Sequence, residues 1–337
     1  MKTLPRVLAG LIALWGAAAY ADTTLTVYTA LEADQVKAYQ DKFEQENPGV
    51  HIKWVRDSTG VITAKLLAEK NNPQADVVMG VAASSLLILD KEGMLQPYAP
   101  KGVDKLTKSY VDAKNPPAWA GMDVWGATIC FNTVEAAKQG LKKPESWKDL
   151  LKPEYKGKIV MPNPASSGTG YFDVSAWLKM FGEKGGWEYM DGLHQNIAQY
   201  EHSGSKPCKQ AATGEYPIGI SFEYRAASLK KGGAPIDLVF PKEGLGWDLE
   251  ATGIMKGTKN LDAAKKLADW SASHSANELY EKNFAVVAMP GVAKPIEFIP
   301  ANYEQMLIKQ DLGWSAANRD RILAEWTKRY DSKSEPK

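Results

Sequence analysis

Residues 158–170 read Lys158-Ile159-Val160-Met161-Pro162-Asn163-Pro164-Ala165-Ser166-Ser167-Gly168-Thr169-Gly170, and an apolar run from Tyr171 to Phe181 follows. The first four residues are typical of a buried strand and the final run of a helix, so the small, hydroxylated turn between them lies where a helix begins. Backbone N–H groups at a helix start lack partners within the helix and carry partial positive charge. Hydroxyls add further donors, and glycine lets a ligand approach the backbone. The sequence therefore predicts an anion-binding turn.

The same composition recurs at two further predicted junctions between a strand and a helix. Asp57-Ser58-Thr59-Gly60 follows a strand at 51–55, and Ser203-Gly204-Ser205 precedes a helix at 207–212. An ordinary helix N-cap and turn would account for any one of them. Ligands of open α/β sheets bind beyond the carboxyl ends of the strands, so three such turns favour a shared oxyanion site. The donors expected there are Ser58, Thr59, Gly60, Ser166, Ser167, Gly168, Thr169, Ser203 and Ser205.

Strand-like and helix-like segments alternate from residue 24 to residue 91, which predicts an α/β fold with a mostly parallel sheet flanked by helices. They include a helix at 33–46, which Asn47-Pro48-Gly49 ends, and a buried strand at 75–79. The segments 124–132 and 247–255 are extended and apolar, and the pattern restarts at each, so we expect them to cross between two lobes. A chain of 337 residues is longer than a single hydrophobic core usually organises, so two lobes are expected. The expected lobes are residues 23–124 with 253–298, and residues 125–252 with 299–337.

The amino terminus has the features of a cleaved secretory signal. Lys2 and Arg6 precede an apolar stretch at 7–18, and the small-x-small site Ala19-Tyr20-Ala21 lies directly before Asp22. The apolar stretch is shorter than the roughly 20 residues that a membrane span needs. We therefore expect residues 1–21 to be removed and the mature protein to be a soluble protein of the periplasm.

The net charge limits the kinds of binding partner, and the cysteine content limits the possible disulfides. Without Lys2 and Arg6, the 41 basic residues become 39 against 40 acidic residues, a formal net charge of −1. This balance argues against nucleic acid or an anionic membrane as the main partner. Cys130 and Cys208 are the only cysteines. In an oxidising compartment they form either a structural disulfide or two separate buried thiols.

Several chemical motifs are missing from the sequence. Neither a phosphate-binding P-loop nor the dinucleotide fingerprint Gly-x-Gly-x-x-Gly is present, and no Gly-x-Ser-x-Gly or cysteine placed like a nucleophile occurs. His51, His194, His202 and His274 lack the spacing of metal ligands. We therefore expect no cofactor, no metal and no enzymatic activity.

Acidic residues on the second crossing segment suggest a cation site. Trp247-Asp248-Leu249-Glu250 places two acids on one face of a strand. A solvent-exposed strand edge would account for Asp248, whereas an acid in an apolar strand is costly unless paired, so Glu250 is the better candidate for a ligand cation. Trp247 is placed to line the cleft, whereas Trp125 sits at a core spacing and should be packing. Glu32, preceded by Tyr28 on its strand, starts a helix at the same rim, where a favourable first-turn acid is the alternative.

Tyr224 and Arg225 follow a predicted strand at 216–222 and offer a phenol and a guanidinium. The planar guanidinium suits a pair of phosphonate oxygens. A surface salt bridge is the alternative for Arg225.

Five segments closely resemble the 2-aminoethylphosphonate-binding periplasmic proteins of ABC transporters. More distantly, the chain is similar to type II periplasmic binding proteins for ferric ion, thiamine and polyamines. The resemblance implies two lobes that close on a ligand about two crossing strands. The segments are Thr26–Asp34, Val55–Gly60, Met161–Gly170, His202–Gln210 and Phe240–Asp248.

The distant relatives sharpen the ligand hypothesis. Ferric-binding members use adjacent tyrosines with a histidine and an acid, and the matching positions are Tyr224, Arg225, Glu32 and Val81, which implies that an iron site is lost. Polyamine-binding and thiamine-binding members place an acid on the second crossing strand, which corresponds to Glu250. The resemblance thus supports a cation contact at Glu250.

The expected function is that of a monomeric receptor that binds 2-aminoethylphosphonate and delivers it to an ABC permease in the inner membrane. The three turns with Tyr224 and Arg225 hold the phosphonate, and Glu250, helped by Glu32 or Asp248, holds the ammonium. A receptor for a sugar phosphate or phosphate is the first alternative, followed by a polyamine or ferric-ion binder. A secreted hydrolase, which would need a nucleophile or metal cluster, and a purely structural exported protein are alternatives of other classes.

Overall fold

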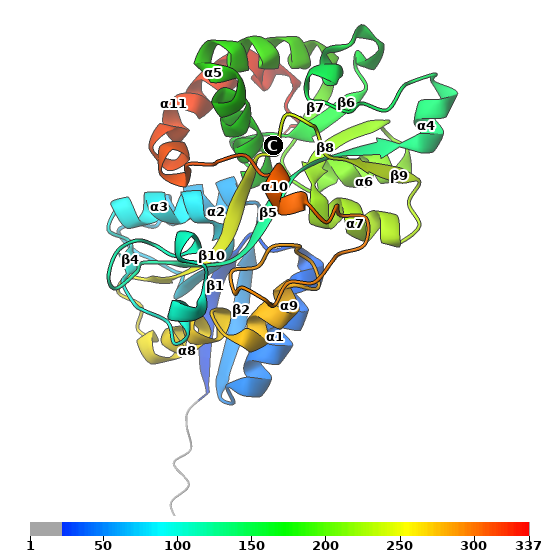
Figure 1. Cartoon of the computed structure of the whole chain (residues 1–337). Coiled ribbons are helices and arrows are strands. Elements are labelled where there is room, and N and C mark those ends of the chain that lie inside the picture. The colour runs from blue at the N-terminus through cyan, green and yellow to red at the C-terminus, as the bar shows by residue number, and fades with distance from the viewer. Residues whose placement is uncertain (1–21, 337) are drawn as a thin grey trace, which may run out of the picture.

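The computed structural model describes residues 22–336 and shows two lobes, one above the other in Figure 1. The signal predicted at residues 1–21 lies outside the described residues. Each lobe is a β-sheet flanked by helices, and the chain passes between the lobes on β5 (Ala120–Asn132) and β10 (Trp247–Met255). The expected α/β fold with two lobes and two crossing strands is confirmed. The residue limits expected for each lobe stay a prediction.

The lower lobe of Figure 1 is built on strands ordered β2-β1-β3-β10, with β4 beside β10. β1 is parallel to β2 and β3, whereas β10 runs antiparallel to β3. All six residues of β3 are buried, as expected for a strand between two neighbours and under helices. The further elements of this lobe are β1 (Thr23–Thr29), α1 (Ala33–Glu46), β2 (Val50–Arg56), α2 (Thr59–Ala68), β3 (Val77–Ala82), α3 (Ala83–Lys91), β4 (Leu95–Gln96), η1 (Val103–Lys105), η2 (Lys108–Tyr110), α8 (Leu261–Ser271) and α9 (His274–Tyr280).

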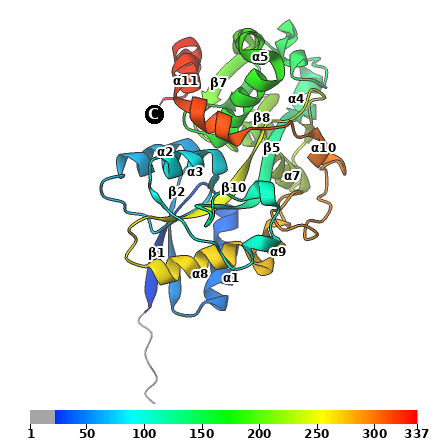
Figure 2. The same ribbon diagram turned by 60° about the vertical axis from the view of Figure 1, so that its left-hand side comes forward.

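The upper lobe continues the sheet in the order β5-β8-β6-β7, with β9 beside β5. β6 is parallel to β7 and β8, and β5 is antiparallel to β8 and β9. The last long helix, α11, packs on α5 of the upper lobe and on α3 of the lower lobe (Figure 2). The elements are α4 (Thr133–Lys138), η3 (Lys148–Leu151), η4 (Pro153–Tyr155), β6 (Ile159–Pro162), α5 (Gly168–Asn196), β7 (Ile197–Glu201), α6 (Lys206–Thr213), β8 (Ile218–Phe222), α7 (Glu223–Lys231), β9 (Ile236–Val239), α10 (Tyr303–Met306), α11 (Leu312–Tyr330) and η5 (Asp331–Lys333).

The cysteines form a disulfide between β5 and α6. Cys130 and Cys208 are fully buried, and their Cα atoms are 5.4 Å apart. The alternative of two separate thiols is therefore wrong. The bond fastens α6, and with it the turn that precedes α6, to a crossing strand.

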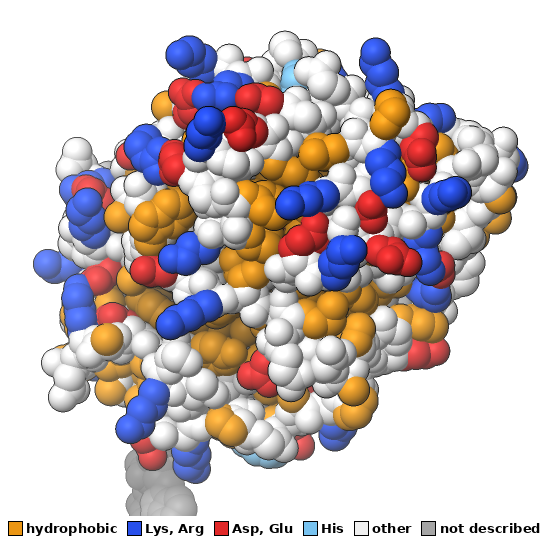
Figure 3. All heavy atoms as spheres, turned by 45° about the horizontal axis from the view of Figure 1, so that its top comes forward, with side chains coloured by type: hydrophobic (Ala, Val, Ile, Leu, Met, Phe, Trp, Pro, Cys, Tyr) orange, Lys and Arg blue, Asp and Glu red, His pale blue; other side chains and the backbone are white. Residues whose placement is uncertain are grey.

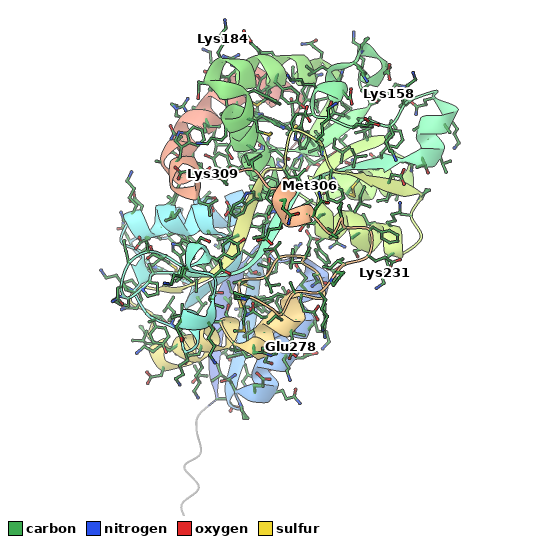
Figure 4. The ribbon with its side chains drawn as sticks, viewed as in Figure 1. Lys158, Lys184, Lys231, Glu278, Met306 and Lys309 are labelled. Atoms are coloured by element: carbon green, nitrogen blue, oxygen red, sulfur yellow. A yellow bond between two sulfur atoms is a disulfide. The ribbon has the colours of Figure 1, made fainter. Side chains whose placement is uncertain are left out.

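The surface carries charges of both signs. Figure 3 shows acidic and basic side chains interspersed over the displayed face, with apolar side chains gathered toward its middle. In Figure 4, Lys158, Lys184 and Lys231 lie at the outer edges of the upper lobe, whereas Met306 and Lys309 lie between the two lobes. Residues 22–336 contain no helix with the length and apolarity that a membrane span requires.

Candidate functional site

A cavity between the lobes is lined by parts of all three donor-rich turns. The turn before α2 contributes Ser58 and Thr59, the turn before α5 contributes residues 167–169, and the turn before α6 contributes Gly204. Three helix N-termini therefore begin at this cavity, and each brings partial positive charge and backbone donors. The lining residues are Ala30, Glu32, Gln35, Ser58, Thr59, Gly80, Trp125, Ser167, Gly168, Thr169, Gly204, Phe222, Tyr224, Glu250 and Phe284.

The three turns also contact one another. The backbone N–H of Gly60 donates to the carbonyl oxygen of Ser166 across the lobes at 2.8 Å. The Ser166 hydroxyl donates to the carbonyl of His202 at 3.1 Å. These two contacts join the first turn to the second and the second to the third. Gly60 and Ser166 thus hold the turns together.

The two serine hydroxyls of the third turn lie next to each other. The Ser203 and Ser205 hydroxyls lie 3.2 Å apart, within hydrogen-bond distance, and neither residue lines the cavity. Gly204, which lies between the two serines, is the residue of this turn that lines the cavity. A Cβ atom on Gly204 would lie 2.7 Å from the Thr169 hydroxyl oxygen, so a side chain there would collide with the second turn.

The other wall of the cavity is aromatic and acidic. Phe222, Tyr224 and Phe284 line it, with the Tyr224 and Phe284 ring centroids 5.4 Å apart. Trp125 donates its indole N–H to the Thr169 hydroxyl at 3.3 Å, which links this wall to the second turn. Glu250 lines the same wall, and its Oε2 atom is buried without a hydrogen-bond donor.

Two further carboxyls lie behind Glu250. Asp123 on β5 is the register partner of Glu250 on β10, and Glu223 begins α7. Both side chains are fully buried. Gly126 donates its backbone N–H to Glu223 Oε2 at 2.8 Å, whereas Glu223 Oε1 and both Asp123 oxygens receive no hydrogen bond from a donor group. We call Asp123, Glu223 and Glu250 the carboxyl cluster.

Burial sets the protonation of the carboxyl cluster. Burial, with the charges of Glu250 and Glu223, raises the pKa of Asp123 well above its ordinary value. Burial raises the pKa of Glu223 to about 8, against the opposing effect of the Gly126 N–H. Burial also raises the pKa of Glu250 to about 8, and the charge of Glu223 adds to the shift while a hydrogen bond from Asp123 opposes it. Without a cation, the cluster therefore holds protons at neutral pH.

Arg225 does not line the cavity. Its guanidinium lies 2.8 Å from the Glu32 carboxylate and 3.0 Å from that of Asp34, both in the lower lobe. Tyr224, which does line the cavity, donates its hydroxyl to Asp34 at 3.1 Å. Arg225 therefore forms a salt bridge, which was the alternative to a contact with the ligand. The salt bridge with Glu32 joins the two lobes, and only 8% of the arginine side chain is exposed.

Asp248 and Trp247 also lie outside the cavity. Ser84 at the start of α3 and Leu249 donate backbone N–H groups to Asp248, and burial raises the pKa of Asp248 to about 6. Trp247 donates its indole N–H to the carbonyl of Ile308 at 2.8 Å. Both residues thus hold neighbouring segments of the protein in place.

Tyr28 points away from the cavity as well. Its hydroxyl donates to the Glu69 carboxylate at 2.9 Å. Of the five residues expected at the ammonium, the cavity is therefore lined by Glu250 and Glu32.

Sequence reasoning missed several residues at the cavity. Trp125 was expected to serve as core packing, and Gln35 and Phe284 carried no recognisable signal. Asp123 and Glu223 did carry a recognisable signal, because an acid within or directly after an apolar strand is costly unless it is paired. That is the argument by which Glu250 was found.

The described residues offer no metal centre. Among residues 22–336, no three His, Cys, Asp or Glu side chains are grouped so that they could hold a metal ion.

Comparison with known proteins agrees with this two-lobed arrangement. The bacterial extracellular solute-binding protein family matches residues 72–304. The structure of the periplasmic binding protein AfuA from Actinobacillus pleuropneumoniae, with exogenous fructose-6-phosphate bound, is 30% identical, with a TM-score of 0.86 over 92% of this chain and 99% of that one.

Two relatives from other bacteria cover most of the chain. The "Probable ABC transporter periplasmic-binding protein y4fP" of Sinorhizobium fredii is 28% identical over 87% of this chain and 82% of its own. The "Putative 2-aminoethylphosphonate-binding periplasmic protein" of Salmonella typhimurium is 26% identical over 82% of each. The family match over more than half of the chain and the likeness to AfuA place the chain in the bacterial extracellular solute-binding protein family, as a periplasmic solute-binding protein of the ABC-importer type.

Proposed function

We propose that the chain binds 2-aminoethylphosphonate, or a close zwitterionic relative, in the cavity between the lobes and delivers it to the permease of an ABC importer. The observation that carries this proposal is that Glu250 lines the same cavity as the three donor-rich turns. A ligand with an oxyanion at one end and an ammonium at the other satisfies both ends of such a cavity.

The phosphonate lies at the turns. The hydroxyls of Ser58, Thr59 and Ser167 and the backbone at Gly168 and Gly204 line that end of the cavity. The helix N-termini favour negative charge there. Arg225 is engaged with Glu32 and Asp34, so its part is to stabilise the closed arrangement of the lobes.

The ammonium lies at the aromatic and acidic wall. Glu250 supplies an oxygen that lacks a donor, and Phe222, Tyr224 and Phe284 supply ring faces. Ammonium groups are attracted to carboxylates and to aromatic faces, more strongly where water is excluded. The cavity is small, which favours a compact ligand.

Calorimetric titration of ligand-stripped protein tests the proposal. 2-Aminoethylphosphonate is expected to bind, and ethylphosphonate, which lacks the ammonium, to bind more weakly by about 2 to 5 kcal/mol because it forms no charged pair with Glu250. Glu250→Gln should reduce this preference. Equal affinity of the parent protein for the two phosphonates would refute the ammonium site.

A receptor for a phosphorylated sugar is the second candidate, because AfuA has fructose-6-phosphate bound. Sugar hydroxyls can also donate to buried acids. Fructose-6-phosphate therefore belongs in the same titration. If it binds more tightly than 2-aminoethylphosphonate, the sugar-phosphate function replaces the one proposed.

A further inference from the structure

The carboxyl cluster contains more carboxyl groups than one ammonium group can neutralise. Three carboxyls lie together, and two of them, Asp123 and Glu223, are fully buried behind the one that lines the cavity. If all three were ionised, three negative charges would face the single positive charge of the proposed ligand. Such an excess is strongly unfavourable in a site without water.

The contact between Asp123 and Glu250 requires a proton. The two residues are paired across β5 and β10, and their carboxyls interact with each other, while no donor group of another residue reaches either Asp123 oxygen or Glu250 Oε2. Ionised carboxylates only accept hydrogen bonds, so one member of this pair must be a neutral acid. Asp123 has no other donor near either oxygen, whereas Glu250 reaches the cavity. Asp123 is therefore the donor and Glu250 the acceptor.

Glu223 lacks a countercharge on any packed element. Its Oε2 accepts the Gly126 N–H, whereas its Oε1 and the hydroxyl of Tyr303 on α10 are both buried without a hydrogen-bond partner. The nearby basic residues, Arg225 and Lys209, face Glu32 instead. An ionised Glu223 therefore makes it harder for Glu250 to lose its proton.

The other titratable groups around Glu250 do not neutralise it. Glu32 at the start of α1 adds negative charge. Tyr39 on α1 and Tyr280 on α9 are buried phenols whose own ionisation is opposed by burial and by the acids. No lysine or arginine of residues 22–336 forms an ion pair with a member of the cluster within 4.0 Å.

We infer that Asp123 and Glu223 are positioning residues of the ligand site, Asp123 as a neutral acid that orients Glu250 and Glu223 as a second buried acid that opposes the ionisation of Glu250, so that Glu250 keeps its proton until an ammonium displaces it. This inference rests on the proposed function. The O–H bond of Glu250 breaks, its proton passes to solvent, and the carboxylate that remains pairs with the incoming cation. The net charge of the cluster together with the ammonium is thereby the same as that of the empty cluster.

Proton release measured by calorimetry tests this exchange. Titrations with 2-aminoethylphosphonate at pH 7 are run in two phosphate-free buffers of different ionisation enthalpy, and the Glu250→Gln variant reports the protons exchanged by the phosphonate itself. The expected difference between the parent protein and this variant is about one proton released per bound molecule. Glu223→Gln should lower that number by a smaller part, because burial still holds the proton on Glu250 while the charge of Glu223 no longer contributes.

Two substitutions at Asp123 separate orientation from charge. Asp123→Asn keeps a hydrogen-bond donor beside Glu250, so affinity should stay within about threefold, whereas Asp123→Leu should weaken binding about tenfold or more. Asp173→Asn is the matched control, since Asp173 is also a fully buried carboxyl with no hydrogen-bond donor but lies outside the carboxyl cluster. It should change neither affinity nor proton release.

The outcomes distinguish the two claims. Failure of the parent protein to bind 2-aminoethylphosphonate refutes the proposed function and this inference with it. Binding with the expected preference over ethylphosphonate, but with no extra proton released, refutes the inference alone. So does Asp123→Leu with parental affinity, or Glu223→Gln with unchanged proton release.

Discussion

Arg225 of the upper lobe lies 2.8 Å from the carboxylate of Glu32 in the lower lobe. The pair is largely buried, with 8% and 13% of the two side chains exposed, and Asp34 completes it at 3.0 Å. Burial by itself would raise the pKa of Asp34, but the hydrogen bond and charge of Arg225 lower it overall. The contact joins the lobes beside the cavity, so it acts on the closed arrangement in particular.

Replacing Arg225 should therefore weaken ligand binding. Arg225→Leu leaves Glu32 and Asp34 without their cation whenever the lobes close, and we expect the Kd to rise about 10- to 100-fold, mainly through faster dissociation. Titration calorimetry and stopped-flow dissociation measure the change. Arg321→Leu is the control, because Arg321 pairs with Glu183 within the upper lobe. Parental affinity in Arg225→Leu would show that the pair does not support closure.

A methyl group at Gly60 should block closure without harming either lobe. A Cβ atom there would lie 2.2 Å from the carbonyl oxygen of Ala165 in the opposite lobe. Gly60→Ala should leave the ligand-free protein as stable as the parent, since alanine favours a helix over glycine by about 1 kcal/mol. Binding should weaken about tenfold or more.

Gly185→Ala is the matched control for that substitution. Its added Cβ would meet only the Phe181 Cβ at 3.5 Å, an ordinary contact within α5. Thermal unfolding and calorimetry on both variants separate stability from binding. If Gly60→Ala bound ligand as tightly as the parent, the cavity would not need the observed contact between the lobes.

Local signals predicted local structure well. The helix expected at 33–46 is α1 (Ala33–Glu46), because apolar spacing marks its face and Asn47-Pro48-Gly49 ends it. The strand expected at 75–79 is found at Val77–Ala82, since a strand buried on both faces has no alternation to mark its ends. The donor-rich turns were recognised because their composition alone indicates helix starts.

Contacts between residues that are far apart in the sequence could not be predicted from local sequence patterns. Arg225 meets acids about 190 positions earlier in the chain, and nothing near it in the sequence indicates them. Trp125 and Trp247 lie on the two crossing strands, and their expected roles are exchanged in the structure. Periodicity gives two faces to a strand, but it does not tell which face meets the cavity.

The disulfide between Cys130 and Cys208 should contribute much of the stability of the upper lobe. It closes a loop with a sequence separation of 78, which in the chain-entropy model corresponds to about 4 kcal/mol of unfolding free energy. The double substitution to alanine should show that loss in urea unfolding. The parent protein under a thiol reductant serves as the comparison, and an unchanged urea midpoint in both would contradict the expectation.

The carboxyl cluster should also make the ligand-free protein less stable as pH rises. The folded state keeps protons on Glu223 and Glu250, with pKa values of about 8, whereas the unfolded chain loses them near pH 4.5. The folded state then binds more protons, so unfolding free energy falls between about pH 5 and pH 8, by about 1.4 kcal/mol per pH unit for each such carboxyl. This stability is complete below pH 4.5 and is lost as pH passes through the folded pKa.

Denaturant unfolding from pH 5 to pH 8.5 measures this slope. Glu250→Gln should flatten it, because one of the buried acids no longer titrates, and should make the ligand-free protein more stable than the parent at pH 8. Asp41→Asn, at a carboxylate with 62% of its side chain exposed, should leave the slope as it is. If Glu250→Gln had the parental slope, Glu250 would already be ionised in the empty cavity. Its charge would then have to be balanced by groups other than a proton.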